Sequence, residues 1–252
     1  MSEPFQIAEA DFTEEHYREL LGLAKEHYRF IGFDELDTPG PTILWRHDID
    51  MSPHRALAIA KLEAEAGVRA TYFVLLHSEH YNALELEVTE RLVAIAHLGH
   101  HIGLHFDPNY YTSLHGDEVD LEPFIRQEST IVETLTGARV MSFSWHNPTV
   151  GAWIERRDGD EIAGLRNVYG TTVRRKFDYV SDSNGVWRFR RLYDVLVRAE
   201  EQHLQVLTHP ALWVPDAMPV RARVSRAIEG RAARQHGRYD EFLAAEGRPN
   251  VR

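Results

Sequence analysis

The segment Leu44-Trp45-Arg46-His47-Asp48-Ile49-Asp50-Met51-Ser52-Pro53 joins an apolar run to two carboxylates and then to a helix start. The run from Thr42 to Trp45 is typical of a buried strand. Ser52 is a good N-cap residue, and Pro53 suits the first position of a helix. The segment therefore predicts a strand, a charged tip and a helix, which is the arrangement in which a strand end can meet a ligand.

The charged tip can present its two carboxylates together. If the strand geometry continues, Arg46, Asp48 and Asp50 share one face and the residues between them share the other. Two such acids could divide their work, one binding a metal and the other moving protons. The structural alternative is that one of them caps the helix or pairs with Arg46.

Composition limits the class of protein. A chain of 252 residues with 43% hydrophobic content can bury one large core, so we expect a single domain over residues 1–252. A formal charge of −11 argues against nucleic acid as a partner. The chain has no cysteine, so His, Asp, Glu or neutral oxygens must hold any metal.

The chain start lacks a basic segment followed by an apolar one, and no window approaches eighteen apolar residues. We therefore expect a soluble cytoplasmic protein without membrane insertion. The sequence does not indicate an oligomeric state.

Strands and helices alternate along the chain, which favours a parallel sheet or barrel. Helices are expected at about 13–30, 53–66, 89–98, 121–136, 192–201 and 218–245. Strands are expected at 42–45, 70–75, 101–105, 140–143, 167–170 and 204–207. Ser183-Asn184-Gly185 is a turn signal that predicts an antiparallel hairpin within residues 178–190.

Unusual polar residues recur where the expected strands end. They are Asp48 and Asp50, His105 and Asp107, His146, and His209. In a barrel these ends lie at one rim, where such folds build their sites. A single histidine of this kind is more often structural, but independent structural histidines have no reason to share a rim.

The chain resembles a known protein family. Three ordered segments resemble the first, second and last motifs of the NodB-like polysaccharide deacetylases, which are metal-dependent carbohydrate esterases: Arg46-His-Asp-Ile-Asp50, Gly99-His-His-Ile-Gly-Leu-His105-Phe-Asp107 and Val206-Leu-Thr-His209-Pro. The resemblance covers about residues 40–215 and leaves 216–252 as a C-terminal helical segment. It implies a single-domain distorted (β/α) barrel, usually seven-stranded, and removal of an N-acetyl group from a sugar.

Three further segments resemble a divergent branch associated with bacterial surface-polysaccharide gene clusters. They are Ser144-Trp-His146-Asn-Pro148, Ser181-Asp-Ser-Asn-Gly-Val-Trp-Arg188 and His209-Pro-Ala-Leu-Trp213. This resemblance implies a role in surface-polysaccharide metabolism, such as that of an O-antigen-like polymer, and a carbohydrate substrate.

The family motifs can be carried over to matching positions. The resemblance implies that Asp48 is the catalytic base, Asp50 a metal ligand, His105 the first metal histidine and His209 the general acid. It also implies a divalent metal cofactor, for which we expect Zn²⁺.

The second motif departs from the family at Asn109, where a further histidine usually stands. An amide oxygen is a weak ligand for zinc, so a replacement is needed. His101 is a poor candidate because four residues along a strand span about 13 Å. Asp107 and His146 remain open, and His146 is preferred because it follows a different strand, while Asp107 would orient a ligand.

Substrate contacts are expected from Arg46, Asp107, Asn109 and Trp213. Each has a structural alternative: Arg46 can form an ion pair with Asp48, and a Trp near a barrel rim is as often part of the core. His209 can likewise be an imidazole packed beneath Trp213.

Two other functions stay open. Because of Asn109, the chain could be a catalytically weak or inactive barrel that binds a glycan or acts as a scaffold. The same polar residues would also suit an amidohydrolase acting on a non-sugar carbon–nitrogen bond.

Overall fold

A computed structural model describes residues 9–147, 158–187 and 190–251. Their strands form one sheet. The strands are β1 (Arg29–Phe30), β2 (Thr42–Ile49), β3 (Thr71–Leu75), β4 (His101–Phe106), β5 (Ser142–Trp145), β6 (Glu161–Ile162), β7 (Leu165–Asn167), β8 (Asp178–Ser181) and β9 (His203–Thr208).

The sheet runs in the order β6-β7-β5-β4-β3-β2-β9-β8, with β1 pairing beside β2. Every pair is parallel except β6 with β7. The predicted α/β class with a parallel, barrel-like sheet is confirmed. The strand count is nine rather than the usual seven, and no pairing joins β6 to β8 in the described residues, so the barrel is open.

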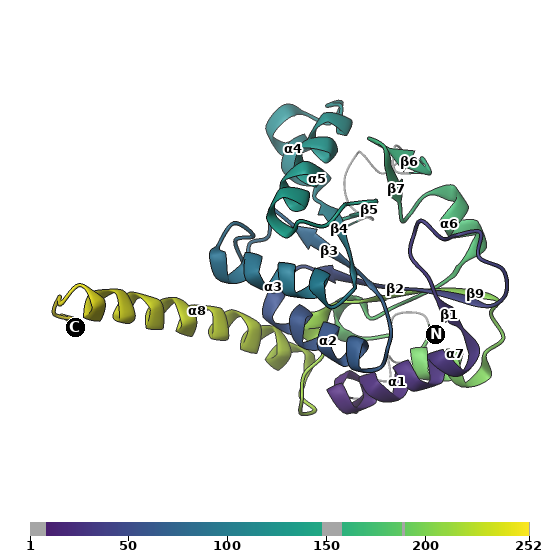
Figure 1. Cartoon of the computed structure of the whole chain (residues 1–252), viewed down its shortest axis with the longest axis horizontal. Helices are drawn as coiled ribbons and strands as arrows, with labels where there is room; N and C mark the ends of the chain where they lie inside the picture. Colours follow the sequence, from purple (N-terminus) through teal and green to yellow (C-terminus); the bar gives the residue numbers. More distant parts are fainter. Residues whose placement is uncertain (1–8, 148–157, 188–189, 252) are drawn as a thin grey trace, which may run out of the picture.

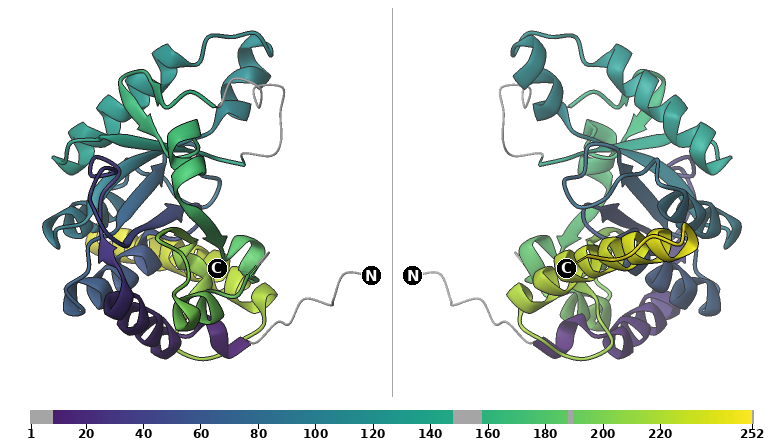
Figure 2. Two further views of the ribbon diagram at one scale, coloured as in Figure 1. Left: turned by 90° about the vertical axis from the view of Figure 1, so that its right-hand side faces the viewer. Right: turned by 90° about the vertical axis from the view of Figure 1, so that its left-hand side faces the viewer.

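Helices follow most of the strands and cover the sheet (Figure 1). They are α1 (Glu14–His27), α2 (Pro53–Glu65), α3 (Leu86–His97), α4 (Pro108–His115), α5 (Glu122–Thr136), α6 (Thr171–Lys176), α7 (Leu192–Arg198) and α8 (Val220–Ala245). Short 3₁₀ turns lie at Glu9–Phe12, Ser183–Gly185 and Pro210–Leu212. The side views show the elements arranged in an arc (Figure 2).

Local chemistry explains where several helices begin and end. The Ser52 side chain accepts a hydrogen bond from the Arg55 backbone N–H, and Pro53 opens α2, as predicted. Helix α5 ends at Gly137, whose φ of 69° lies in the left-handed region that glycine adopts without strain.

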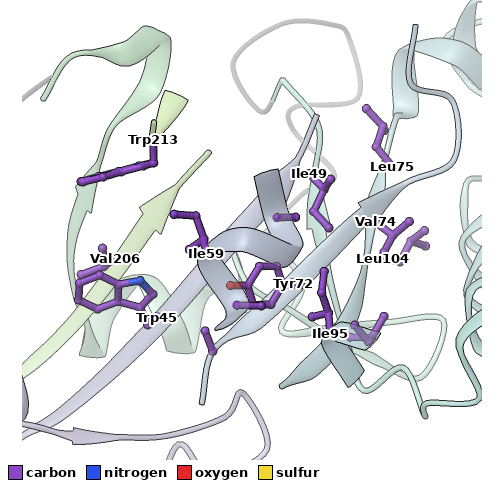
Figure 3. Packing of buried hydrophobic residues seen from close by; sticks show 14 of the residues in the cluster. Trp45, Ile49, Ile59, Tyr72, Val74, Leu75, Ile95, Leu104, Val206 and Trp213 are labelled. Atoms are coloured by element: carbon purple, nitrogen blue, oxygen red, sulfur yellow. The ribbon is translucent and has the colours of Figure 1, made fainter. Parts of the chain in front are cut away.

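Strand β2 separates two cores. Trp45 belongs to the large core beneath the helices, together with Tyr72 and Ile59 (Figure 3). Leu44 points the other way and packs with Phe73 in a smaller core on the concave side. The alternation predicted for this strand is therefore present, with both faces covered.

The end of β2 differs from the prediction. The strand was expected to stop at Trp45, yet it continues to Ile49 and all eight residues are buried. The early end was predicted because a carboxylate inside a strand is costly to desolvate. Asp48 lies there because Arg46 and Ser144, the latter distant in sequence, donate hydrogen bonds to it.

The predicted hairpin within 178–190 is wrong. Asp178–Ser181 pairs in parallel with β9, and Val186 and Trp187 are not in a strand. Asn184 and Gly185 do adopt left-handed conformations, with φ of 60° and 73°, so the turn signal was real. It ends β8, and among the described residues β8 has no antiparallel partner.

Smaller differences concern boundaries. The strands expected at 140–143 and 167–170 lie at Ser142–Trp145 and Leu165–Asn167. Helix α4 was not expected, because its eight residues carry only a short apolar pattern.

Helix α8 extends away from the body of the molecule (Figure 1). In the described ranges, no helix combines the length and the apolar character that crossing a bilayer requires.

Candidate metal centre and active site

The main cavity, of about 970 Å³, opens where parallel strands end. The carboxyl ends of β2, β4, β5 and β9 supply Asp50, His105, His146 and His209, and all four line this cavity. Because parallel strands present these ends at one edge, residues distant in sequence meet there. We call this cavity the main pocket.

Three side chains converge in the main pocket as a metal would require. One donor atom each from Asp50, His105 and His146 lies within 4.8 Å of the other two. Asp50 Oδ1 lies 3.2 Å from His105 Nε2 and 3.8 Å from His146 Nδ1. The two ring nitrogens are 3.1 Å apart. One carboxylate with two imidazoles is a common zinc donor set that leaves coordination positions open.

The surroundings of the cluster fit a bound cation. His105 Nδ1 lies 3.2 Å from the Ser144 carbonyl oxygen, which orients the ring so that Nε2 faces Asp50. Asp50 Oδ1 is buried and has no hydrogen-bond partner of ordinary geometry within the part of the chain that the structure describes. A buried carboxylate oxygen of this kind is costly unless something electropositive meets it.

Electrostatics keep the Asp50 carboxylate ionised. Burial raises its pKa, but the neighbouring His105, His209 and His146 outweigh this effect and lower the pKa. Burial and the neighbouring His105 lower the pKa of His146, so this imidazole stays neutral and able to donate a lone pair.

Asp48 has one oxygen held and one free. Its Oδ2 accepts hydrogen bonds of 3.2 Å from Arg46 Nη2 and 3.2 Å from the Ser144 hydroxyl. Its Oδ1 is buried and has no hydrogen-bond partner in the described ranges, and the residue lines the main pocket. Asp48 is therefore fixed in place at the pocket wall, with one oxygen that accepts no hydrogen bond from the described residues.

Arg46 lies behind Asp48 and does not line the main pocket. It is fully buried, with its guanidinium over the rings of Phe73 and Tyr169, and it donates a hydrogen bond to the Tyr169 hydroxyl. Burial lowers the pKa of Arg46, but Asp48 outweighs this effect and the net shift is upward. The geometry supports the structural alternative, an ion pair that orients Asp48, over direct substrate contact.

His209 is held by a carboxylate that the sequence analysis did not single out. Asp182 is fully buried and accepts bonds from His209 Nδ1 at 2.6 Å, from the His209 backbone N–H and from Trp213 Nε1. His209 Nε2 lies 3.7 Å from Asp50 Oδ2. Burial lowers the pKa of His209, but Asp182, Asp50 and Asp48 outweigh it and raise the pKa to about 9.

The structure does not bring Asp107, Asn109 or Trp213 into the main pocket. Asp107 is the N-cap of α4, where its side chain accepts a bond from the Asn109 backbone N–H. Trp213 is fully buried, so it has no face for stacking on a sugar. Pro148 and Arg188, the ends of two resemblance segments, lie outside the described residues.

Asp182 and Tyr169 are the functional positions that sequence reasoning missed. Asp182 follows the end of β8, so the rule that identified the other strand-end residues would have found it if β8 had been recognised as parallel. No sequence signal marks Tyr169, which meets Arg46 across 123 positions.

No protein-family model matches the chain, and no curated protein matches it either. Several solved structures resemble it. A family 4 carbohydrate esterase from Bacillus anthracis is 16% identical, over 87% of this chain and 86% of that one, with a TM-score of 0.43. The peptidoglycan deacetylase PdaC from Bacillus subtilis is 12% identical, over 82% and 97%, with a TM-score of 0.43.

The chitin deacetylase from Colletotrichum lindemuthianum is 12% identical, over 76% of this chain and 83% of that one, with a TM-score of 0.40. Similarity at this level does not identify a substrate, so function has to be inferred from the residues in the main pocket.

Proposed function

We propose that this protein is a metal-dependent hydrolase that removes an N-acetyl group from a carbohydrate. The observation that carries the proposal is the convergence of Asp50, His105 and His146 within 4.8 Å, with Asp48 and His209 lining the same pocket. The motif resemblance points to deacetylation, because it assigns a role to four of these five residues. Its finer part, a place in surface-polysaccharide metabolism, belongs to the proposal.

The three converging residues would hold a divalent cation, for which their donor types favour zinc. When bound, this cation would polarise the acetyl carbonyl and make a nearby water more acidic. In the proposal His146 takes the place of the histidine that the family has at Asn109.

Asp48 acts as the general base. Its free Oδ1 accepts a proton as the water oxygen bonds to the acetyl carbon, while Arg46 and Ser144 hold Oδ2 and prevent the carboxylate from rotating away. Arg46 is a positioning residue because it acts only through Asp48.

His209 acts as the general acid. Asp182 raises the pKa of His209 against the effect of burial, which favours a proton on both ring nitrogens. Asp182 holds the Nδ1 proton, so the Nε2 proton can pass to the sugar nitrogen as the carbon–nitrogen bond breaks. The products are acetate and a sugar amine.

Release of acetate from N-acetylated oligosaccharides tests this proposal. The metal-loaded protein should release acetate and expose one primary amine per acetate, whereas Asp48→Asn should not. Arg198→Gln is a matched control, because Arg198 is exposed and lies in neither pocket. No release on any N-acetyl sugar, with metal bound, would favour a glycan-binding or scaffold role.

A non-sugar amide is the remaining enzymatic alternative. Equal release of acetate from N-acetylated amino compounds and from sugars would favour it, since a sugar-specific pocket should discriminate between them.

A further inference from the structure

A second cavity of about 390 Å³ lies between the start of α2, the first half of α3 and the first half of α8. Met51, Ser52 and Ala211 line both this cavity and the main pocket, so the two adjoin. We call the second cavity the arginine pocket, because it is lined by Arg55, Arg91, Arg223, Arg226, Arg231 and Arg234. Among the described residues that line it, Glu87 alone carries a carboxylate.

The lining of the arginine pocket is rich in positive charge, whereas the whole chain carries a formal net charge of −11. Part of it is neutralised by ion pairs. Glu87 pairs with Arg91 and Arg234, while Glu85 pairs with Arg231. Arg55 pairs with Glu14. Four of the six guanidinium groups are thus already matched by acids.

The other two guanidinium groups form no ion pair among the described residues, and the carboxylates nearest Arg223 are Asp182, Glu9 and Asp11, which raise its pKa while burial outweighs them and lowers it. Arg226 is exposed and has no ion pair or hydrogen bond within the part of the chain that the structure describes. Arg223 is 1% exposed, and its Nη1 and Nη2 are buried without any hydrogen-bond partner among those same residues. Buried guanidinium nitrogens that lack an acceptor are costly for a protein to retain.

The position of Arg223 is fixed by its other contacts. Its Nε donates a 2.9 Å hydrogen bond to the Met218 carbonyl oxygen, and its guanidinium carbon lies 4.2 Å from the centre of the Phe12 ring. The group is therefore held rigidly while its two outer nitrogens stay unused. A fixed pair of donors is suited to bidentate binding of an oxyanion.

The N-terminus of α2 lies in the same pocket. Ser52, Pro53, His54 and Arg55 line it, and a helix of 13 residues carries partial positive charge at this end. Burial, together with Arg91 and Arg55, lowers the pKa of His54, which is the effect expected in a positive local field.

We propose that the arginine pocket binds a phosphate or pyrophosphate group carried by the substrate. The inference rests on the proposed function, since it takes the adjoining main pocket as the place of deacetylation. The substrate is then an N-acetyl sugar bearing a phosphate ester, with the sugar in the main pocket and the phosphate on Arg223 and Arg226. A phosphate has the charge and the several oxygens to engage two guanidinium groups and a helix N-terminus together, which a single carboxylate does not.

Titration calorimetry of inorganic pyrophosphate into the full chain tests the pocket without turnover. Saturable binding of about one pyrophosphate per chain is expected. Arg226→Gln should weaken it by about tenfold, because a charge-assisted contact is lost. Arg198→Gln, which removes one exposed arginine elsewhere, should leave it unchanged.

Two further variants separate the arginine pocket from the metal centre. Arg223→Gln should weaken pyrophosphate binding more than Arg226→Gln does. Because Arg223 is buried, its variant could fail to fold, and the result for the exposed Arg226→Gln then tests the proposal. Asp50→Ala should retain binding, because an anion held only by the metal would be lost with it. The proposal is overturned if no saturable binding occurs, if Arg226→Gln binds like the parent, or if Asp50→Ala alone abolishes binding.

Acetate release identifies the source of the phosphate. One arm uses a nucleoside-diphosphate N-acetyl sugar, and the other an N-acetyl sugar phosphate on a lipid in phosphatidylcholine vesicles. On the preferred substrate, Arg226→Gln should raise KM by about tenfold with little change in kcat, and it should not affect an unphosphorylated oligosaccharide. Pyrophosphate binding without any acetate release would support the phosphate site and refute the proposed function. Acetate release that does not depend on a phosphate group would support the proposed function and refute the phosphate site.

Discussion

Each face of strand β2 carries a buried carboxylate network, but only one of the two networks borders the main pocket. On the concave face, Arg46 and Asp48 form a buried ion pair whose carboxylate lines the main pocket. On the helix-covered face, His47 lies 2.7 Å from Glu63, and both side chains are fully buried (the neighbouring Trp45 and Tyr72 are seen in Figure 3). Two adjacent residues therefore start two buried networks, only one of which reaches a cavity.

The difference lies in how completely each carboxylate is satisfied. Glu63 accepts hydrogen bonds from the hydroxyls of Tyr17 and Tyr72 and contacts His47. Asp48 keeps one oxygen that has no hydrogen-bond partner among the residues described. A carboxylate with all its lone pairs engaged stabilises a fold, whereas one with a free oxygen beside a cavity can do chemistry.

The largest effect is expected on the concave face. Asp48→Asn should lower kcat by about 10²- to 10⁴-fold, because the amide cannot accept the proton that Asp48 takes. Bound metal and unfolding free energy should change little. Steady-state kinetics with thermal unfolding provides the measurement, and an equal loss of metal in Asp48→Asn would contradict its role as a base.

The other face should respond in stability. Glu63→Leu leaves His47 and two tyrosine hydroxyls without their shared acceptor, so we expect a loss of about 3 to 5 kcal/mol in unfolding free energy. Denaturant titration measures this loss, and kcat per folded molecule should stay near the parent value. A fall in kcat comparable to that of Asp48→Asn would show that the two faces are not separate.

Glu63 also predicts how the unfolding free energy depends on pH. Burial raises the pKa of Glu63, but His47 and then His100 and Tyr17 outweigh it and lower the pKa from the ordinary value of 4.5. A lowered carboxyl pKa means that the unfolded chain binds the proton more tightly, so this stability is present above pH 4.5 and is lost as the pH falls below it. The stability difference between the parent and Glu63→Gln should therefore shrink below pH 4.5, and a difference that grows there would contradict the pairing.

The concave face was the more predictable of the two from sequence. Alternation along β2 placed Arg46, Asp48 and Asp50 together, and the strand-end rule added His105, His146 and His209. These are local patterns, and the structure brings the last five of these residues into one pocket. Sequence alone also indicated the parallel α/β class.

The helix-covered face could not be predicted in the same way. Glu63 looks like an ordinary polar residue of an amphipathic helix, and only the packing of α2 on β2 reveals it as the partner of His47. Asp182 was missed because the turn at Asn184 favoured a hairpin, whereas the edge of β9 offered parallel pairing. Both failures concern contacts between segments distant in sequence, which local propensity does not contain.

The smallest effect is expected at the position where the chain departs from its resemblance. Asn109→Ala should leave metal affinity almost unchanged, because an amide oxygen is a poor ligand for zinc and Asn109 does not line the main pocket. Competition with a chromogenic chelator measures the affinity. A large loss would place a ligand on α4 and remove the need for His146.

The central claim is that Asp50, His105 and His146 hold one divalent metal. Elemental analysis of protein purified without chelator, compared across variants, tests it most directly. About one metal per chain is expected for the parent and for Asp107→Ala, with a large loss in Asp50→Ala and His146→Ala. Retention of metal in His146→Ala with loss in Asp107→Ala, or no uptake by the parent after reconstitution with zinc, would contradict the claim.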